Sequence, residues 1–234
     1  VKRRKEDYFG WAYGRPSVKK AIYKYDIQQL KNEKESRFGQ FLDKNPDVLD
    51  YLVFAKQCEK AISGGNPWSD QKRSIKAVQN LIPKAEKGYR SATDDFLRFR
   101  YAYQLMLLAR YGNQHGKAIE VFNKSIKPLK NHGPLYYWAL HHKAFCHLQK
   151  QQPIRANLAS AKVFANAPAK RLRAFLYFDN GMVEATIDRN NLPAEKAARL
   201  RAMKNMMNPG PAIEPMRTIY RADPKNKTLR FLLV

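Results

Sequence analysis

Apolar residues recur at spacings of three and four along most of this chain, from about residue 46 to residue 222. This spacing places them on one face of an α-helix, and no segment alternates apolar and polar residues for long enough to indicate a β-strand. The sequence therefore predicts an all-α fold of roughly nine helices joined by short polar connections. The pattern covers 48–62, 75–89, 93–111, 118–129, 137–148, 154–165, 169–188, 193–207 and 212–222.

Several residues in the first half of the chain are typical of helix ends. Gly64–Pro67 stops the first run, and Ser69 or Asp70 can cap the next helix. The run over 93–111 follows Ser91–Thr93, which can cap it, and is apolar on nearly every side. We therefore expect that helix to be buried between its neighbours.

Residues 1–46 differ from the rest, because their aromatic residues are scattered among glycine and proline. We expect an irregular N-terminal arm over 1–46, with a short helix around 17–32, and a helical-repeat domain over 47–234. The chain begins without methionine and ends in an apolar stretch, so we expect the repeat domain to continue in a longer protein. No signal-peptide type stretch is present, but a cleaved one would leave the same start, so the compartment stays open.

Two stretches of the chain align with each other, which indicates an internal repeat. The first joins 102–106 to 116–122, and the second joins 140–144 to 153–156 and ends at Pro168. Ala118 and Ala156 are equivalent in this alignment and lie 38 residues apart. Because short connections favour antiparallel neighbours, we expect helix hairpins that stack into an α-solenoid.

Ala144, Ala156 and Pro168 stand where the tetratricopeptide pattern has small residues and a terminal proline, although Leu140 replaces its tryptophan. The chain thus resembles a degenerate tetratricopeptide-like array, a family with a period of about 34 residues. This resemblance implies a right-handed superhelix that binds protein or peptide partners. Four strings also resemble a set of large uncharacterised bacterial helical-repeat proteins, which implies no catalytic residue: 45–59, 99–104, 137–140 and 162–168.

The chain is strongly basic, with 44 Lys and Arg against 20 Asp and Glu and a formal net charge of +24. The excess is greatest over 101–170, where 10 basic residues stand against one acid, Glu120. Three pairs of basic residues there are seven apart, close to two helical turns, so each pair predicts a cationic stripe along one helix face. The pairs are Lys117 and Lys124, Lys143 and Lys150, and Arg155 and Lys162.

Like charges with no acid nearby repel one another, and an anionic partner would relieve that repulsion. Such a partner is an acidic protein segment, a nucleic-acid backbone or an anionic surface, while simple solvation of exposed helix faces gives the same spacing. Neither a paired Cys/His finger nor an RNA-binding strand motif is present in the sequence. We predict a non-enzymatic helical-repeat scaffold for a protein or peptide; the alternative is a basic solenoid that binds nucleic acid or another polyanion.

One cluster has the residue types of a metal site: His132, His141, His142, Cys146 and His147. His142 and Cys146 share a helix face, so a metal-dependent enzyme is a third hypothesis. The interleaved apolar residues instead favour a helix that faces the core. Cys58 and Cys146 both lie within helical runs, away from the helix starts and loops that favour a reactive thiolate. We therefore predict no catalytic residue, no metal and no cofactor.

Overall fold

The structure is a computed structural model that describes residues 16–63, 73–129, 133–207 and 213–229. Within these ranges every regular element is a helix, which confirms the all-α prediction. The chain divides into two compact units, Val1–Gln114 and His115–Val234, so the boundary expected after residue 46 falls inside the first unit. None of the helices in the described ranges is long and apolar enough to cross a membrane.

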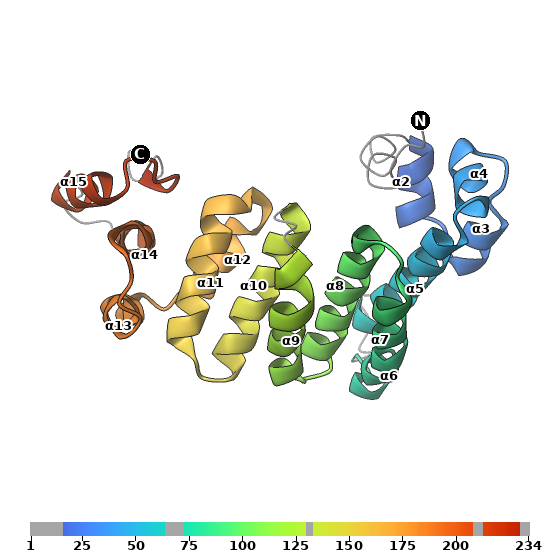
Figure 1. Cartoon of the computed structure of the whole chain (residues 1–234), viewed down its shortest axis with the longest axis horizontal. Coiled ribbons are helices and arrows are strands. Elements are labelled where there is room, and N and C mark those ends of the chain that lie inside the picture. The colour runs from blue at the N-terminus through green and yellow to red at the C-terminus, as the bar shows by residue number, and fades with distance from the viewer. Residues whose placement is uncertain (1–15, 64–72, 130–132, 208–212, 230–234) are drawn as a thin grey trace. The chain divides into compact units, whose positions relative to one another are not determined.

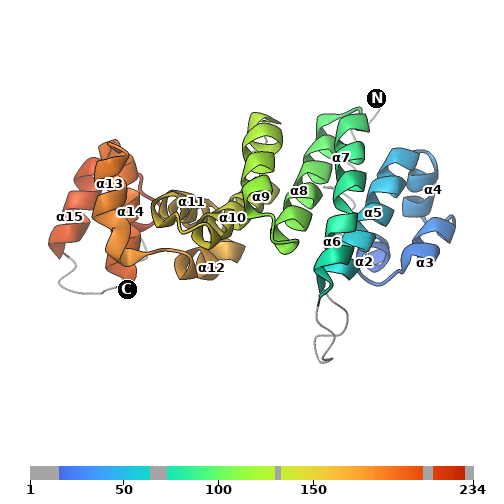
Figure 2. The same cartoon turned by 90° about the horizontal axis from the view of Figure 1, so that it is seen from below.

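The first unit is built from α2 to α8, of which α5 and α8 are the longest (Figure 2). Helices α6 and α7 pack against α8, and α8 also packs against α5. The bounds are α2 Pro16–Tyr23, α3 Ile27–Asn32, α4 Arg37–Asp43, α5 Pro46–Ser63, α6 Ile75–Asn80, α7 Ile82–Ser91 and α8 Asp95–Tyr111.

The N-terminal region is more regular than the sequence suggests, because α2 and α3 replace the single helix expected around 17–32 and α4 follows them. Asp26 and Gln29 form a capping box at the start of α3, and the Ser36 hydroxyl caps α4. Leu30 and Phe38 are buried in a core that includes Val48 of α5. Residues 16–43 are therefore folded onto α5, while residues 1–15 of the expected arm lie outside the described residues.

The helix expected over 75–89 is divided into α6 and α7. Ser74 caps α6 through the backbone N–H of Ala77, and α6 ends at Asn80. Pro83 stands in the first turn of α7, where its missing N–H costs nothing but where a continuous helix would clash. The predicted cap at Ser69 or Asp70 and the stop at Gly64–Pro67 lie outside the described residues.

Helix α8 begins within two residues of its predicted start. The cap is Asp94, whose Oδ1 accepts the N–H of Leu97 at 2.8 Å, rather than a residue of Ser91–Thr93. Apolar residues are buried on several faces of α8, among them Leu97, Phe99 and Leu105. This confirms that the helix is buried between neighbours.

The second unit contains α9 to α15 and several short 3₁₀ or π segments, written η. Figure 1 shows α10 and α11 side by side as a hairpin, with α12 packed on them. The bounds are α9 His115–Val121, η1 Phe122–Ile126, η2 Lys127–Leu129, α10 Pro134–Gln149, α11 Pro153–Asn166, η3 Pro168–Lys170, α12 Arg171–Leu176, η4 Asn180–Met182, α13 Val183–Arg189, α14 Ala194–Met207 and α15 Ile213–Ala222.

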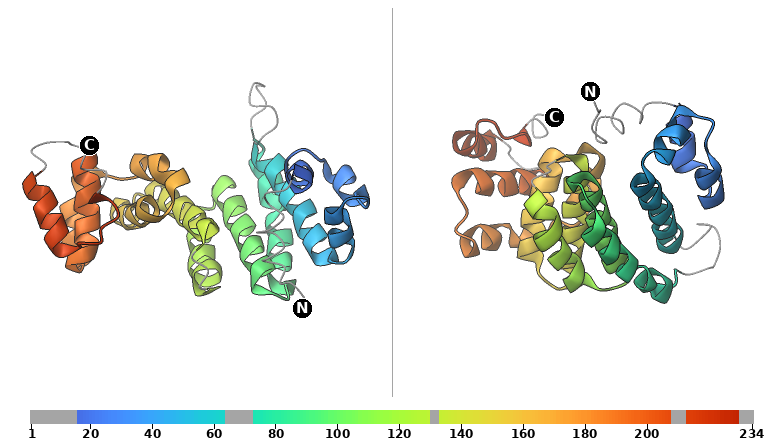
Figure 3. Two further views of the ribbon diagram at one scale, coloured as in Figure 1. Left: turned by 90° about the horizontal axis from the view of Figure 1, so that it is seen from above. Right: turned by 45° about the vertical axis from the view of Figure 1, so that its right-hand side comes forward.

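The helix expected over 169–188 is interrupted, and α12 and α13 stand in its place. Asn157 of α11 binds the chain between them: its Oδ1 accepts the N–H of Asp179 at 2.8 Å and its Nδ2 donates to the Asp179 carbonyl at 2.9 Å. These bonds take the backbone groups of Asp179 that a continuous helix would use. Helix α13 then packs against α11 and α14, and α14 packs against α15 (Figure 3).

Three helices end in the same left-handed turn. Asn113, Gln151 and Asn191 have φ of 61°, 54° and 42°, and they lie 38 and 40 residues apart. After each one, the next backbone N–H donates to a carbonyl five residues back: Gln114 to Ala109, Gln152 to His147 and Leu192 to Ile187, at 2.8, 2.9 and 3.1 Å. This is the Schellman closure of a helix C-terminus. The first of these intervals equals the spacing of the sequence repeat.

The alanines of the sequence repeat are buried. Ala102, Ala118, Ala144 and Ala156 each expose 0% of their surface. Small side chains at such positions let two helix backbones approach closely, which is the reason for expecting alanine there.

Candidate anion-binding site

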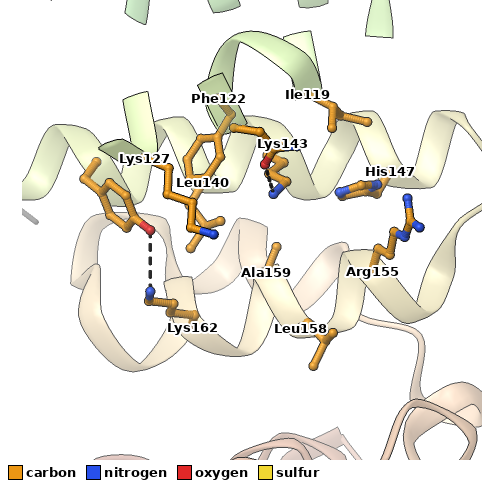
Figure 4. A pocket seen from close by; sticks show the side chains of 12 residues that line it. Ile119, Phe122, Lys127, Leu140, Lys143, His147, Arg155, Leu158, Ala159 and Lys162 are labelled. Atoms are coloured by element: carbon orange, nitrogen blue, oxygen red, sulfur yellow. Dashed lines mark hydrogen bonds between the residues drawn. The ribbon is translucent and has the colours of Figure 1, made fainter. Parts of the chain in front are cut away.

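A pocket of about 360 Å³ opens in the second unit among η1, η2, α10 and α11. Four basic residues line it, which are Lys127 of η2, Lys143 of α10, and Arg155 and Lys162 of α11 (Figure 4). None of the twelve described residues that line it is an aspartate or a glutamate. We call this feature the basic pocket.

Apolar side chains form much of the remaining surface. They come from α9, η1, α10 and α11, and they are Ile119, Phe122, Leu140, Leu158 and Ala159. Phe122 and Leu140 are themselves buried, so the floor is held firmly by the core beneath it. A pocket with an apolar floor and a few charged groups is the usual form of a ligand site.

The amine of Lys143 is held by two neighbours from η1. Its Nζ donates to Oδ1 of Asn123 at 2.8 Å and lies 4.7 Å from the centroid of the Phe122 ring. Both contacts fix the amine at the pocket rather than in open solvent. Lys143 is half-buried as a result.

Lys162 approaches from the opposite helix of the hairpin. Its Nζ lies 3.5 Å from the hydroxyl of Tyr136 and 5.3 Å from the centroid of that ring. Tyr136 is buried, so its hydroxyl gives Lys162 a fixed contact. Arg155 lies two turns earlier on α11 and is exposed, which leaves its guanidinium accessible from outside.

Phe122 and Asn123, which contact Lys143, are the first two residues of the π segment η1. The backbone N–H of Lys127 donates to the carbonyl of Phe122, five residues back, where an α-helix would bond four residues back. This wider turn changes the direction in which the following residues point. Lys127, which comes directly after it, therefore lines the pocket.

The surroundings of the basic pocket lower the proton affinity of Lys143 and His147. Burial, followed by the charges of Lys127, Arg155 and Lys162, lowers the pKa of Lys143 to about 8. Burial also lowers the pKa of His147, with Lys143 and Arg155 adding to the effect and a hydrogen bond to Gln152 opposing it. A bound anion would favour the charged form of both groups.

The structure brings together three of the six predicted stripe residues. Lys143, Arg155 and Lys162 line the basic pocket, whereas Lys117 and Lys150 do not. Lys124 forms an exposed ion pair with Glu120 at 2.7 Å. The stripes therefore converge in part, through one member of the Lys143 pair and both members of the Arg155 pair.

Sequence reasoning missed Lys127, Asn123 and Tyr136 as members of this site. Lys127 belongs to the same acid-poor stretch as the stripes, but it lacks a basic residue seven positions away. Asn123 carries no charge, and it bonds Lys143 from within the π segment. None of the three therefore had a spacing signal in the sequence.

The histidine cluster serves packing in the described residues. His141 stacks on Tyr177 with ring centroids 4.9 Å apart, and His147 binds Gln152 through Nδ1 at 2.8 Å. No group of three or more His, Cys, Asp or Glu that could hold a metal occurs among the residues described, and His132 lies outside them. Burial raises the pKa of the Cys58 thiol to about 12, which disfavours a thiolate.

Comparison with protein-family models, with curated proteins and with solved structures finds no match to this chain. Its function is therefore inferred from the chemistry of the basic pocket itself.

Proposed function

We propose that this chain is a non-enzymatic helical-repeat scaffold that binds an acidic segment of a partner protein. Its helix hairpins are tetratricopeptide-like and stack as an α-solenoid. The basic pocket receives a carboxylate-bearing side chain of the partner, and residues flanking that side chain lie over α10 and α11. The observation that carries the proposal is a pocket with four cations and no acid among its lining residues.

Two structural features support the repeat architecture. The same Schellman closure recurs at Asn113, Gln151 and Asn191. The alanines that align in the sequence repeat are buried. Together they indicate a chain made from copies of one helix hairpin, which is the unit from which solenoids are built.

An acidic segment suits the pocket because it supplies both charge and apolar contact. A carboxylate can accept hydrogen bonds from Lys127, Arg155 and Lys162, and charge-assisted bonds of this kind are the stronger ones. The apolar floor formed by Phe122 and Leu140 can cover the methylene groups of the same side chain.

The test is a fluorescence-anisotropy titration with a labelled peptide rich in glutamate and aspartate. Wild type is compared with the double variant Arg155→Gln/Lys162→Gln, and Lys124→Gln/Lys150→Gln is the matched control. Both variants remove two positive charges, but only the first removes them from the basic pocket. We expect the pocket variant to bind about tenfold more weakly, or about 1.4 kcal/mol, and the control to change little. Equal losses in both variants would contradict the proposal.

The alternative is a basic solenoid that binds nucleic acid or another polyanion, and the net charge of +24 favours it. Such binding depends on many phosphate contacts and weakens steeply with salt. We expect both double variants to lose affinity for single- and double-stranded nucleic acid by the same factor. Tight nucleic-acid binding together with no peptide binding would replace the first proposal with this one.

A further inference from the structure

Lys143 is half-buried and lies in a cationic part of the basic pocket. Three positive groups surround it, Lys127 from η2 and Arg155 and Lys162 from α11, and His147 lies one turn further along α10. The remaining neighbours from η1 are neutral, Asn123 and Phe122. Tyr136 of α10 is the one phenol in the lining. No acid among the lining residues compensates these charges.

We propose that Lys143 is a reactive amine that takes an acyl group from a small acyl phosphate bound in the basic pocket. The phosphate of the donor lies among Lys127, Arg155 and Lys162, and the acyl carbon faces Nζ of Lys143. This inference uses the same pocket as the proposed scaffold function but does not depend on it.

The pocket meets each requirement of this reaction. Its volume of about 360 Å³ exceeds the size of a two- or three-carbon acyl phosphate. The three surrounding cations bind an anionic donor and stabilise the charge that develops on the departing phosphate. Asn123 holds the amine in place at 2.8 Å and, as an acceptor, leaves the nitrogen lone pair free to attack.

The step balances without any further reactant. The lone pair of the neutral amine attacks the acyl carbon, the C–N bond forms, and the bond between the acyl carbon and the phosphate oxygen breaks. The phosphate leaves as hydrogenphosphate with the proton that the amine gives up. The product amide is neutral like the amine that reacts, but it no longer takes up a proton, so the ammonium form of Lys143 is lost from the pocket.

The expected rate advantage of Lys143 over an ordinary lysine follows from the proton affinity of its amine. With a pKa of about 8, Lys143 has at pH 8 roughly a hundredfold larger neutral fraction than an exposed lysine. A less basic amine is also a weaker nucleophile. If the rate of attack depends on pKa for amines as it does for thiols, the lower pKa of Lys143 slows its attack about tenfold. We therefore expect Lys143 to react about tenfold faster than an ordinary lysine.

The test is acetylation of the full chain at pH 8, followed residue by residue with peptide mass spectrometry. Lys150 is the internal control, since it ends the same helix and is exposed. With uncharged acetic anhydride we expect about a tenfold preference for Lys143 over Lys150. With acetyl phosphate we expect a larger preference, which inorganic phosphate reduces by competition. Above pH 8 the preference falls, because the neutral fraction of Lys143 approaches its limit while that of an ordinary exposed lysine keeps rising.

Two variants separate the role of the cations from that of the amine. Arg155→Gln/Lys162→Gln should lower the preference with both donors, and more with acetyl phosphate, because the phosphate loses its contacts. Lys143→Arg keeps the charge and should abolish the modified peptide, and circular dichroism confirms that both variants are folded. Acetylation by acetyl phosphate that is no faster at Lys143 than at Lys150 would overturn the proposal. An unchanged preference in the Arg155→Gln/Lys162→Gln variant would overturn it too.

The outcomes also separate this inference from the scaffold function. Peptide binding is measured on unmodified protein, so its absence removes the acidic-partner proposal and leaves the reactivity of Lys143 standing. Slow acetylation of Lys143 together with tight peptide binding removes the reactivity proposal and leaves the acidic-partner proposal standing.

Discussion

Gln151 holds a backbone conformation that its side chain disfavours. Gln151 lies between α10 and α11 and has φ of 54°. The other two Schellman turns have asparagine at this position, a residue that tolerates the left-handed region better. Gln151 is exposed, so its side chain has little packing to lose. The strain is stored at the turn that joins the two helices of the basic pocket.

We expect Gln151→Gly to stabilise the protein by about 0.5–1 kcal/mol, because glycine adopts this conformation without steric cost. Part of the gain is offset by the greater freedom of glycine in the unfolded chain. Thermal unfolding followed by circular dichroism measures the change. The control is Gln149→Gly in the last turn of α10, which should destabilise by a similar amount. A loss of stability in Gln151→Gly would show that the turn is not strained.

At the scale of the elements, the break between α12 and α13 depends on one buried side chain. Asn157 is fully buried and bonds both backbone groups of Asp179, and its Nδ2 also lies 3.4 Å from Oγ1 of Thr186 on α13. A single amide thus connects α11 to the loop before α13 and to α13 itself. Its removal leaves two polar backbone groups without these partners.

Asn157→Ala should therefore cost about 1–3 kcal/mol, the penalty for leaving buried polar groups unsatisfied. For a chain of this length the thermal midpoint falls by about 2–4 °C for each kcal/mol. Differential scanning calorimetry gives the shift, and Gln149→Ala on exposed α10 surface serves as the control. A midpoint within about 1 °C of wild type would mean that Asn157 does not hold the break.

These elements also show which parts of the fold can be predicted from the sequence alone. The spacing of apolar residues predicts where helices form, and Ala118 and Ala156 predict the repeat, because both signals are local. The bond between Asn157 and Asp179 joins residues 22 positions apart, so periodicity over 169–188 cannot reveal the interruption. Pro83 is a local signal for a helix start, but the apolar spacing continues on both sides of it and predicts a single helix over 75–89.

The residues of the basic pocket are likewise predicted only in part by local sequence signals, because their convergence depends on contacts between distant parts of the chain. Seven-residue spacing finds Lys143, Arg155 and Lys162, but it finds Lys117, Lys124 and Lys150 with equal strength. Which of the six converge depends on how α10 and α11 pack and on the π segment after α9. The roles of Asn123 and Lys127 depend on that segment, and no residue pattern in the sequence predicts it.

At the scale of the whole molecule, the net charge of +24 opposes the folded state, because folding brings like charges closer together. Most of the described ion pairs are exposed, such as Arg98 with Asp95 and Lys124 with Glu120, and pairs of this kind contribute little. Salt that screens the long-range repulsion should therefore help the fold more than it weakens these pairs.

We expect the thermal midpoint to rise by several degrees between about 10 mM and 150 mM NaCl, where the screening length falls from about 30 to 8 Å. Unfolding curves at a series of salt concentrations test this. The same series with sodium phosphate at equal ionic strength reports any additional binding of the anion. A midpoint that falls as NaCl is added would indicate that ion pairs outweigh the general repulsion.

The recurring Schellman closure has a consequence for how such a chain can lengthen. Residues 114–151 begin just after one left-handed turn and end on the next, so both ends of this segment meet the same backbone geometry. Tandem duplication of the segment would place each copy behind a turn of the type that already precedes it. Growth by whole hairpins then needs no new joint, whereas an insertion that does not run from one such turn to the next must create one.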